Sequence, residues 1–585
     1  MECRFHLHHV RPGWSRGVLM LPLDFLDLAD QPSKRHMYWG AGQRILAAAR
    51  KVKAHPQLFG TFITNFSCGP DSFVVNYFRD IMGRKPSLTL ELDSHTADAG
   101  LETRIEAFLD IVQAYRQLGA DQALQPAVNG FQPARTTVRN GVLHVIDSSG
   151  RTVPYTDPRV TLLFPAMGDL AVRAVSATFS SYGFHARAHE PSNEAILKLG
   201  RGNTSCKECL PLILTTGTLL NYAQHKRRPD EVVLYFMPTG SGPCRFGQYY
   251  IFMEDLVRKL QIPDVAMFSL SSDDGYAGLP TSLHRRGWWA VVVSDIFEDI
   301  RAMLLANARD SDAAMALFDT QYQAVLSTME LGSFDALLSA LAQAARKLAG
   351  VALKRPVAEV PVVSLMGEIY VRRDGLSRQY LTEQLAAKGI ATICAPVSEW
   401  ILYSDFIVNK GFGDYTHQSW REKLNARIKQ LFMWLDDRRI RKALAVSGLV
   451  HAEAIRVGEV IDTARPYISP YLGGEAILTV GSSLKEVVSQ TCGVIAIGPF
   501  GCMPNRLAES ILSEAMQRDN KLASEPHNDR LRAVLADVHD LPFLAIESDG
   551  SPFPQLIHAK LEAFCLRAER MHERMRAGGM GGHSP

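Results

Sequence analysis

The sequence predicts an α/β protein with two or three parallel-sheet units and a helical connector. Short apolar runs rich in β-branched residues alternate along the chain with stretches of helical period. Strands that alternate with helices of about 10–15 residues form parallel sheets, because each crossover helix carries the chain back to the same end of the sheet. The 585 residues are 46% hydrophobic and 21% charged, which is ordinary for a globular protein with more than one buried core.

The elements follow one another in a regular order. In the first half, we expect strands at 60–67 and 88–93, a helix at 100–119, and further strands at 161–169, 231–238 and 264–271. The stretch 293–355 is helical in period and Ala/Leu-rich, and it predicts the connector. The strand pattern then restarts, with strands expected at 360–368, 391–397, 493–501 and 542–548.

These elements predict three α/β units, one connector and one tail. The tail, AGGMGGHSP, is Gly-rich and is expected to be disordered. The predicted boundaries are an α/β unit at 1–155, a second at 156–290, the helical connector at 291–355, a third α/β unit at 356–575 and the tail at 576–585.

Two distant stretches, 60–109 and 493–564, share one order of features. Each contains a strand, a loop with Cys beside Gly and Pro, a helix, a strand that carries Glu and Asp, and a helix with the letters EAF. The similarity is compatible with an internal duplication of an α/β unit. A chance match is the alternative, because strand–helix–strand units are common.

Charge and cysteine content narrow the class of protein. A net charge of +2 gives no global attraction to nucleic acid or to an anionic membrane. No apolar run reaches the roughly 18 residues that span a bilayer, and the early hydrophobic stretch is interrupted by Asp24 and Asp27. Nine cysteines are too few for a disulfide scaffold, so we expect a cytoplasmic protein with reduced thiols.

Five cysteines lie in loops that also contain Gly or Pro, and most of these loops follow an apolar strand and precede a helix. The loops are NFSCGPDSF with Cys68, TSCKECLP with Cys206 and Cys209, PTGSGPCRFGQY with Cys244, and GPFGCMPNR with Cys502. Ligands of α/β sheets bind at the carboxyl ends of the strands, where such loops lie. Glycine allows close approach of the backbone to a bulky ligand, and an arginine could balance its charge, so the candidate cofactor-binding residues are Gly69, Gly242, Gly501 and Arg245.

The spacing of the cysteines leaves their chemistry open. One CxxC, at 206–209, is compatible with a redox dithiol, but a zinc ribbon requires a second CxxC. The compact C-x₂-C-x₂-C run of ferredoxins is absent, so a cluster would be assembled from distant loops. Inert buried thiols are the remaining alternative, and that role is expected for Cys394, Cys492 and Cys565, which have apolar neighbours.

Two further patterns bear on catalysis. No GxxxxGK[ST] occurs, so the chain lacks a P-loop motif. His95, near Glu91 and Asp93 after a predicted strand, is compatible with an acid–base group or with a loop in which Asp or Ser caps the next helix.

The ordered set of motifs resembles a known family. NFSCGPDSF, ELDSHTADAGLETRIEAFLD, TSCKECLP, MPTGSGPCRFGQY, GEIYVR, APVSEW and GPFGCMPNR occur in this order. Together they resemble the acyl-CoA dehydratase activase-related proteins, which are relatives of the 2-hydroxyglutaryl-CoA dehydratase subunits and of double-cubane cluster proteins. The resemblance covers the chain from about residue 20 to about residue 570.

The resemblance implies flavodoxin-like domains and an iron–sulfur cluster of the 4Fe-4S or double-cubane type. Carried over by motif, the ligand candidates are Cys68, Cys209, Cys244 and Cys502, with Cys206 as a further candidate. Many relatives carry actin-like ATPase modules in front of this region. The present sequence lacks those modules, so the resemblance implies a separate ATP-hydrolysing iron–sulfur activator as partner.

The resulting expectation is an iron–sulfur protein that accepts low-potential electrons from that activator. It would use them to reduce a small molecule or to dehydrate a 2-hydroxyacyl-CoA by radical chemistry, and a homodimer is compatible with either activity. No CoA-specific motif is evident, which favours the reduction. The alternative is a non-catalytic scaffold that docks an ATPase partner and carries a structural metal.

Overall fold

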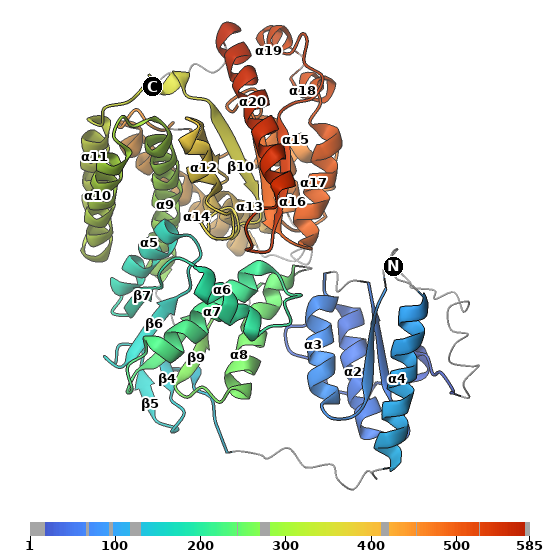
Figure 1. Ribbon diagram of the computed structural model, residues 1–585. Coiled ribbons are helices and arrows are strands. Elements are labelled where there is room, and N and C mark those ends of the chain that lie inside the picture. Colours follow the sequence, from blue (N-terminus) through green and yellow to red (C-terminus); the bar gives the residue numbers. More distant parts are fainter. Residues whose placement is uncertain are drawn as a thin grey trace. The chain divides into compact units, whose positions relative to one another are not determined.

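The computed structural model describes residues 18–65, 69–92, 98–117, 130–240, 242, 244–269, 281–410, 420–451, 453–525 and 527–579 (Figure 1). The contacts within the chain divide it into two compact units. Unit 1 contains the described residues of Met1–Phe131, Ser205–Glu208 and Arg245–Phe252. Unit 2 contains the described residues of Gln132–Thr204, Cys209–Cys244 and Met253–Pro585.

Unit 1 is built on a parallel pair of strands, which is drawn in blue in Figure 1. Strand β1 pairs with β2 in a register that sets Gly60 opposite Ser87. Side chains of β1 alternate between buried and exposed, as one-sided packing of a strand requires. Its elements are η2 (Leu23–Phe25), α2 (Gly40–Ala54), β1 (Gly60–Thr64), α3 (Asp71–Met82), β2 (Ser87–Glu91) and α4 (Asp98–Gln117).

Unit 2 contains a first four-stranded parallel sheet, with strand order β7-β6-β8-β9. The central strands β6 and β8 are buried along their whole length, which explains their continuous apolar sequence. The strands are β6 (Val160–Phe164), β7 (His185–Ala188), β8 (Val232–Phe236) and β9 (Val265–Phe268). The helices between them along the chain are α5 (Asp169–Ser180), α6 (Glu194–Gly202), α7 (Leu210–His225), η4 (Arg245–Gln248) and α8 (Tyr249–Lys259). Of these, η4 and the first residues of α8, up to Phe252, belong to unit 1.

A second four-stranded parallel sheet of unit 2 has the order β11-β10-β12-β13. Its strands are β10 (Val362–Gly367), β11 (Ala391–Cys394), β12 (Val494–Pro499) and β13 (Phe543–Ser548). When the strands of each sheet are numbered along the chain, both sheets read 2-1-3-4, the beginning of the flavodoxin-like order. The α/β prediction with parallel flavodoxin-like sheets is therefore confirmed.

Helices fill the rest of unit 2. The range 291–355, predicted as the helical connector, holds most of α9 (Thr281–Asn307) and all of α10 (Ser311–Leu331) and α11 (Phe334–Ala349), and η5 (Val357–Glu359) follows it. The second sheet is accompanied by α12 (Leu381–Ala387), α13 (Val397–Lys410), α14 (Trp420–Ala445), α15 (Val457–Ala464), α16 (Ala476–Glu486), α17 (Met503–Ala515), α18 (Arg518–Ser524), α19 (Asp529–Val534) and α20 (Gln555–Ala577). No described helix is both long and apolar enough to cross a membrane.

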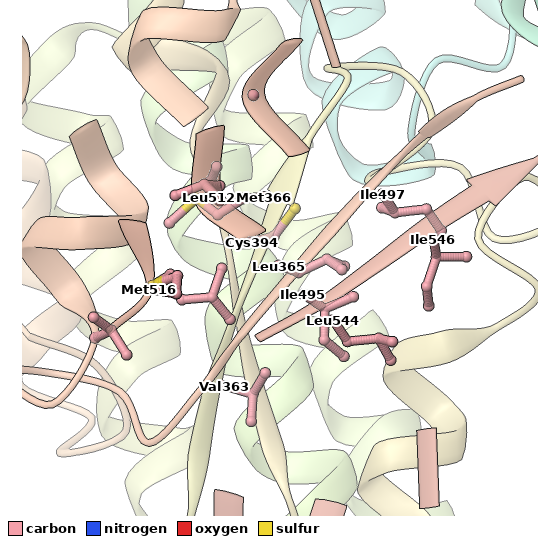
Figure 2. Close-up of a cluster of buried hydrophobic side chains, with 14 of the residues drawn as sticks. Val363, Leu365, Met366, Cys394, Ile495, Ile497, Leu512, Met516, Leu544 and Ile546 are labelled. Carbon is pink, nitrogen blue, oxygen red and sulfur yellow. The ribbon is translucent and has the colours of Figure 1, made fainter. Parts of the chain in front are cut away.

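One apolar core joins the second sheet to helices of the first. Figure 2 shows its centre, where side chains of the strands and of α17 meet. Residues Leu197, Leu210 and Ile213 of α6 and α7 belong to the same buried cluster. The two sheet regions of unit 2 are thus held together by shared burial of apolar surface, the main source of folding free energy.

Four strands of unit 2 differ from the sequence prediction. Residues 135–154 form an antiparallel sheet of β3 (Arg135–Arg139), β4 (Val142–Ile146) and β5 (Thr152–Pro154), which was not expected. Edge strand β7 was missed because its four residues, HARA, contain no β-branched or large apolar side chain. Its pairing with β6 supplies the backbone hydrogen bonds that its sequence does not signal.

The half-buried carboxyl of Glu486, at the end of α16, gives the second sheet a pH-dependent stability. Burial raises the pKa of Glu486 to about 7, although its carboxylate accepts a hydrogen bond from the Ser364 hydroxyl at 2.7 Å. Because the folded chain binds this proton more tightly than the unfolded chain does, the stabilisation is complete below the unfolded pKa and disappears as pH rises through about 7. As pH rises from 5 to 8, the free energy of unfolding of a Glu486→Gln variant should therefore increase by about 2 kcal/mol relative to that of the wild type.

Urea unfolding of the two proteins across that pH range measures the difference. A Glu514→Gln variant is the matched control, because Glu514 is exposed on α17. Parallel stability curves for wild type and Glu486→Gln would contradict the assignment.

Candidate metal centre

Two of the candidate cysteines follow corresponding strands in the two sheets of unit 2. Cys244 lies beyond β8 and Cys502 lies beyond β12, and each of these strands is the third of its sheet. In the 2-1-3-4 order, the chain reverses direction across the sheet between the first and third strands. Ligands of such sheets bind at this switch point, outside the carboxyl ends of the strands. Both thiols therefore follow the strand that borders the expected ligand site.

Glycines in the left-handed region shape these loops. Gly242 has φ = 123° and Gly501 has φ = 67°, conformations that side chains with a Cβ rarely adopt. Gly69, in the predicted Cys68 loop, has φ = 54°, and a Cβ there or at Gly242 would meet nothing within 4 Å. The predicted cofactor glycines thus have a backbone reason to be glycine, and their role toward a cofactor stays a prediction.

Cys209 and Cys502 each occupy the same position at the start of a helix. Cys209 is the N-cap of α7 and Cys502 is the N-cap of α17, and each is followed two residues later by proline. Proline suits this first turn because it needs no hydrogen-bond donor there. The N-cap position sets each thiol beside the first turn of its helix, whose amides can stabilise a thiolate ligand.

The thiol of Cys502 is nevertheless held in its neutral form. Burial raises the pKa of Cys502 well above its ordinary value, and the charges of Glu368 and Cys244 act in the same direction. The backbone N–H of Asn505 opposes this shift. A thiol of this kind is a poor nucleophile, but a metal ion that binds it replaces the proton. Burial thus disfavours dithiol chemistry at Cys502, and the role of this thiol as a metal ligand stays a prediction.

Cys206 lies in unit 1, while Cys209 lies in unit 2. Cys206 is exposed and has φ = 61°, which is uncommon for a residue other than glycine. The loop that carries it is tied to the rest of unit 1 by charged groups. Lys207 forms an ion pair with Glu91, and the Glu208 carboxylate accepts hydrogen bonds from the Asn76 amide and from the backbone N–H of Ser205.

Arg245 is buried in unit 1 and contacts the loop that carries Cys206. Its guanidinium donates to the Ser72 hydroxyl at 3.2 Å and to the Lys207 carbonyl at 3.5 Å. These bonds fasten the start of η4 to α3 and to the Cys206 loop. The structure thus gives Arg245 a positioning role within unit 1, and its predicted role toward a cofactor stays a prediction.

The remaining ligand candidate and the histidine of the sequence analysis cannot be placed. Cys68 and His95 both lie outside the described residues. Among the residues that are described, no three His, Cys, Asp or Glu side chains gather as a metal-binding group. The described part of the chain thus supplies thiols of suitable chemistry at suitable loops, without a complete ligand set.

A carboxylate group beside Cys502 was missed by the sequence analysis. Glu368, directly after β10, accepts the backbone N–H groups of Tyr370 and Val371 at 3.2 and 2.9 Å. Burial raises its pKa, and the charge of Glu475 adds to the shift. Arg372 donates to Glu475 at 2.8 Å. The only sequence signal was the motif GEIYVR, and Glu475 is too far along the chain to be associated with it.

The cysteines predicted to be structural are buried. Cys394, Cys492 and Cys565 are 3%, 1% and 4% exposed and belong to the apolar core. Figure 2 shows Cys394 among the aliphatic side chains of the second sheet. Burial raises the pKa of each thiol. The prediction that these three thiols are buried is confirmed.

Comparisons with known proteins leave this fold and these loops as the evidence on function. No family model matches the chain, and neither a curated protein nor a solved structure matches it.

Proposed function

We propose that this chain is an iron–sulfur protein that accepts low-potential electrons from a separate ATP-hydrolysing activator. It would use them to reduce a small molecule or, as a second possibility, to dehydrate a 2-hydroxyacyl-CoA. The observation that carries the proposal is that Cys244 and Cys502 follow the third strands of two sheets with one strand order. The motif resemblance described above supports the same chemistry.

The described residues fit the binding of such a cluster in three ways. Cys209, Cys244 and Cys502 would supply thiolates, with Cys206 and Cys68 as further candidates. The amides at the starts of α7 and α17 would donate hydrogen bonds to the sulfur atoms. Burial of Cys502 would limit access of water, and this lowers the stability of charged cluster states and tunes the potential. When bound, the cluster supplies one-electron transfer.

The proposal requires a partner chain. No P-loop motif occurs in the sequence, so the free energy that drives electrons to a low potential would come from the activator. An electron lent to a 2-hydroxyacyl-CoA would be returned after loss of water, whereas an electron used for reduction would be consumed and supplied again by the activator.

The alternative proposal is a non-catalytic scaffold that docks the ATPase partner and carries a structural metal. Anaerobic purification followed by iron and acid-labile sulfide analysis, with EPR of the reduced protein, separates the two. We expect iron and sulfide in comparable amounts and an EPR signal from the reduced cluster. Zinc with iron and sulfide near zero would reject electron transfer and support the scaffold.

A further inference from the structure

Helix α14 has a second apolar face in addition to the one that packs into unit 2. Met433, Ile440 and Leu444 are buried in a cluster that also contains residues of α9, α10 and α11. The other face is exposed to between 39% and 55% at each of its apolar residues, which are Ile428, Leu431, Phe432, Trp434 and Leu435. Residues 428, 431, 432 and 435 follow helical spacing, so they form one continuous surface.

The helix that carries this surface is held firmly. The Asp436 carboxylate is buried and accepts two hydrogen bonds from Arg285, at 2.7 and 2.8 Å, and one from the Trp289 indole at 2.7 Å. The Trp288 indole donates to the Met433 carbonyl at 3.0 Å. Buried charge-assisted bonds of this kind fix the orientation of a helix. The exposed apolar side chains are therefore presented on a rigid element, as a preformed binding surface requires.

The charges on this face are mostly cationic, although the exposed carboxylate of Asp335 on α11 pairs with Arg439 there at 3.0 Å. Arg427, Arg438 and Lys442 are exposed, and helical spacing sets them in line with Leu431 and Leu435. The two acidic residues of the segment 427–445, Asp436 and Asp437, are buried at 2% and 4% exposure. Any partner therefore meets an apolar centre with cationic ends.

We propose that the α14 face, from Arg427 to Lys442, is a docking site for another protein that presents an apolar helix flanked by carboxylates. The composition of the face fits protein recognition, because Trp, Phe and Arg are enriched at protein interfaces, whose rims are polar. Complementary charge would orient the partner and speed its association. This site is separate from the cysteine loops and does not depend on the cluster.

A second copy of the chain fits the face less well. A second copy paired face to face would set its arginines and lysine against those of the first copy. Charge complementarity therefore favours an acidic protein partner.

The test uses the full chain and two synthetic helical peptides with leucine at a and d positions. One peptide carries glutamate at e and g, and the other carries lysine there. Fluorescence anisotropy should show binding of the glutamate peptide that weakens as salt is added. The double variant Leu431→Ser/Trp434→Ser should bind it at least roughly tenfold more weakly. The control variant Leu331→Ser changes a side chain that is 90% exposed on α10 and should bind as the wild type does.

Each contrary result overturns the proposal in a defined way. Equal binding of both peptides, no binding of the glutamate peptide, or unchanged binding by the double variant would exclude recognition of an acidic helix at this face. Self-association of the chain, lost in the double variant, would assign the face to a second copy. Flotation with anionic phosphatidylserine vesicles, lost in the double variant, would assign it to a membrane. Near-UV circular dichroism checks that the double variant is folded.

Discussion

Replacing Cys244 by serine is expected to remove most of the iron and acid-labile sulfide from anaerobically purified protein. A serine hydroxyl is a much weaker ligand than a thiolate for the iron of such clusters. Cys244 is exposed, so the change should leave the fold intact. Iron and sulfide per chain, together with the EPR signal of the reduced protein, measure the loss.

Cys394→Ser is the matched control for this experiment. Cys394 is the last residue of strand β11 in unit 2, and it is buried in the apolar core (Figure 2). Its sulfur donates to the Arg372 carbonyl at 3.5 Å, a bond that a serine hydroxyl can keep. We expect this variant to retain its iron and sulfide. Equal loss from both variants would contradict the division of the cysteines into ligand candidates and structural thiols.

Gly200→Ala is expected to destabilise unit 2 by about 3 kcal/mol, near the upper end of overpacking effects. Gly200 lies where α6 crosses α7, and a Cβ there would come within 1.9 Å of the Ile213 carbonyl oxygen. Since that atom belongs to backbone, the helices must move apart. Cys209 begins α7, so the variant should also retain less iron. Calorimetry reports the lower melting temperature, and iron analysis reports the second effect.

Gly202→Ala provides a control two residues away in the same helix. A Cβ at Gly202 would meet nothing within 4 Å. Alanine has a higher helix propensity than glycine by up to about 1 kcal/mol, so this variant should match or slightly exceed the wild type in stability. If both alanine variants lost the same stability, close packing of α6 on α7 would not be the cause.

The strands that could be predicted are those whose burial produces a recognisable pattern of apolar residues in the sequence. β6, β8 and β12 are buried along their length, and a run of apolar residues is the sequence signal of such strands. β7 was missed because an edge strand needs only one partner strand and little apolar surface. The register and order of strands depend on contacts between distant segments, which periodicity does not report.

The residues of the candidate site also include some that the sequence predicts and some that it does not. The loops of Cys209, Cys244 and Cys502 were found from local signals, because glycine and proline mark backbone that helices and strands do not use. Glu368 and Glu475 were missed as neighbours of Cys502, since they come from different parts of the chain. The apolar face of α14 was also missed, because an apolar helix residue has the same signature whether it is buried or exposed.

By itself, the sequence determined the α/β class, the helical connector and the cysteine loops of this protein, since these follow from local periodicity and turn residues. The tertiary structure alone decided that two sheets share one strand order, that Cys244 and Cys502 follow equivalent strands, and that α14 keeps an exposed apolar face. These properties depend on which segments pack against one another, and packing selects among many arrangements that one local pattern permits.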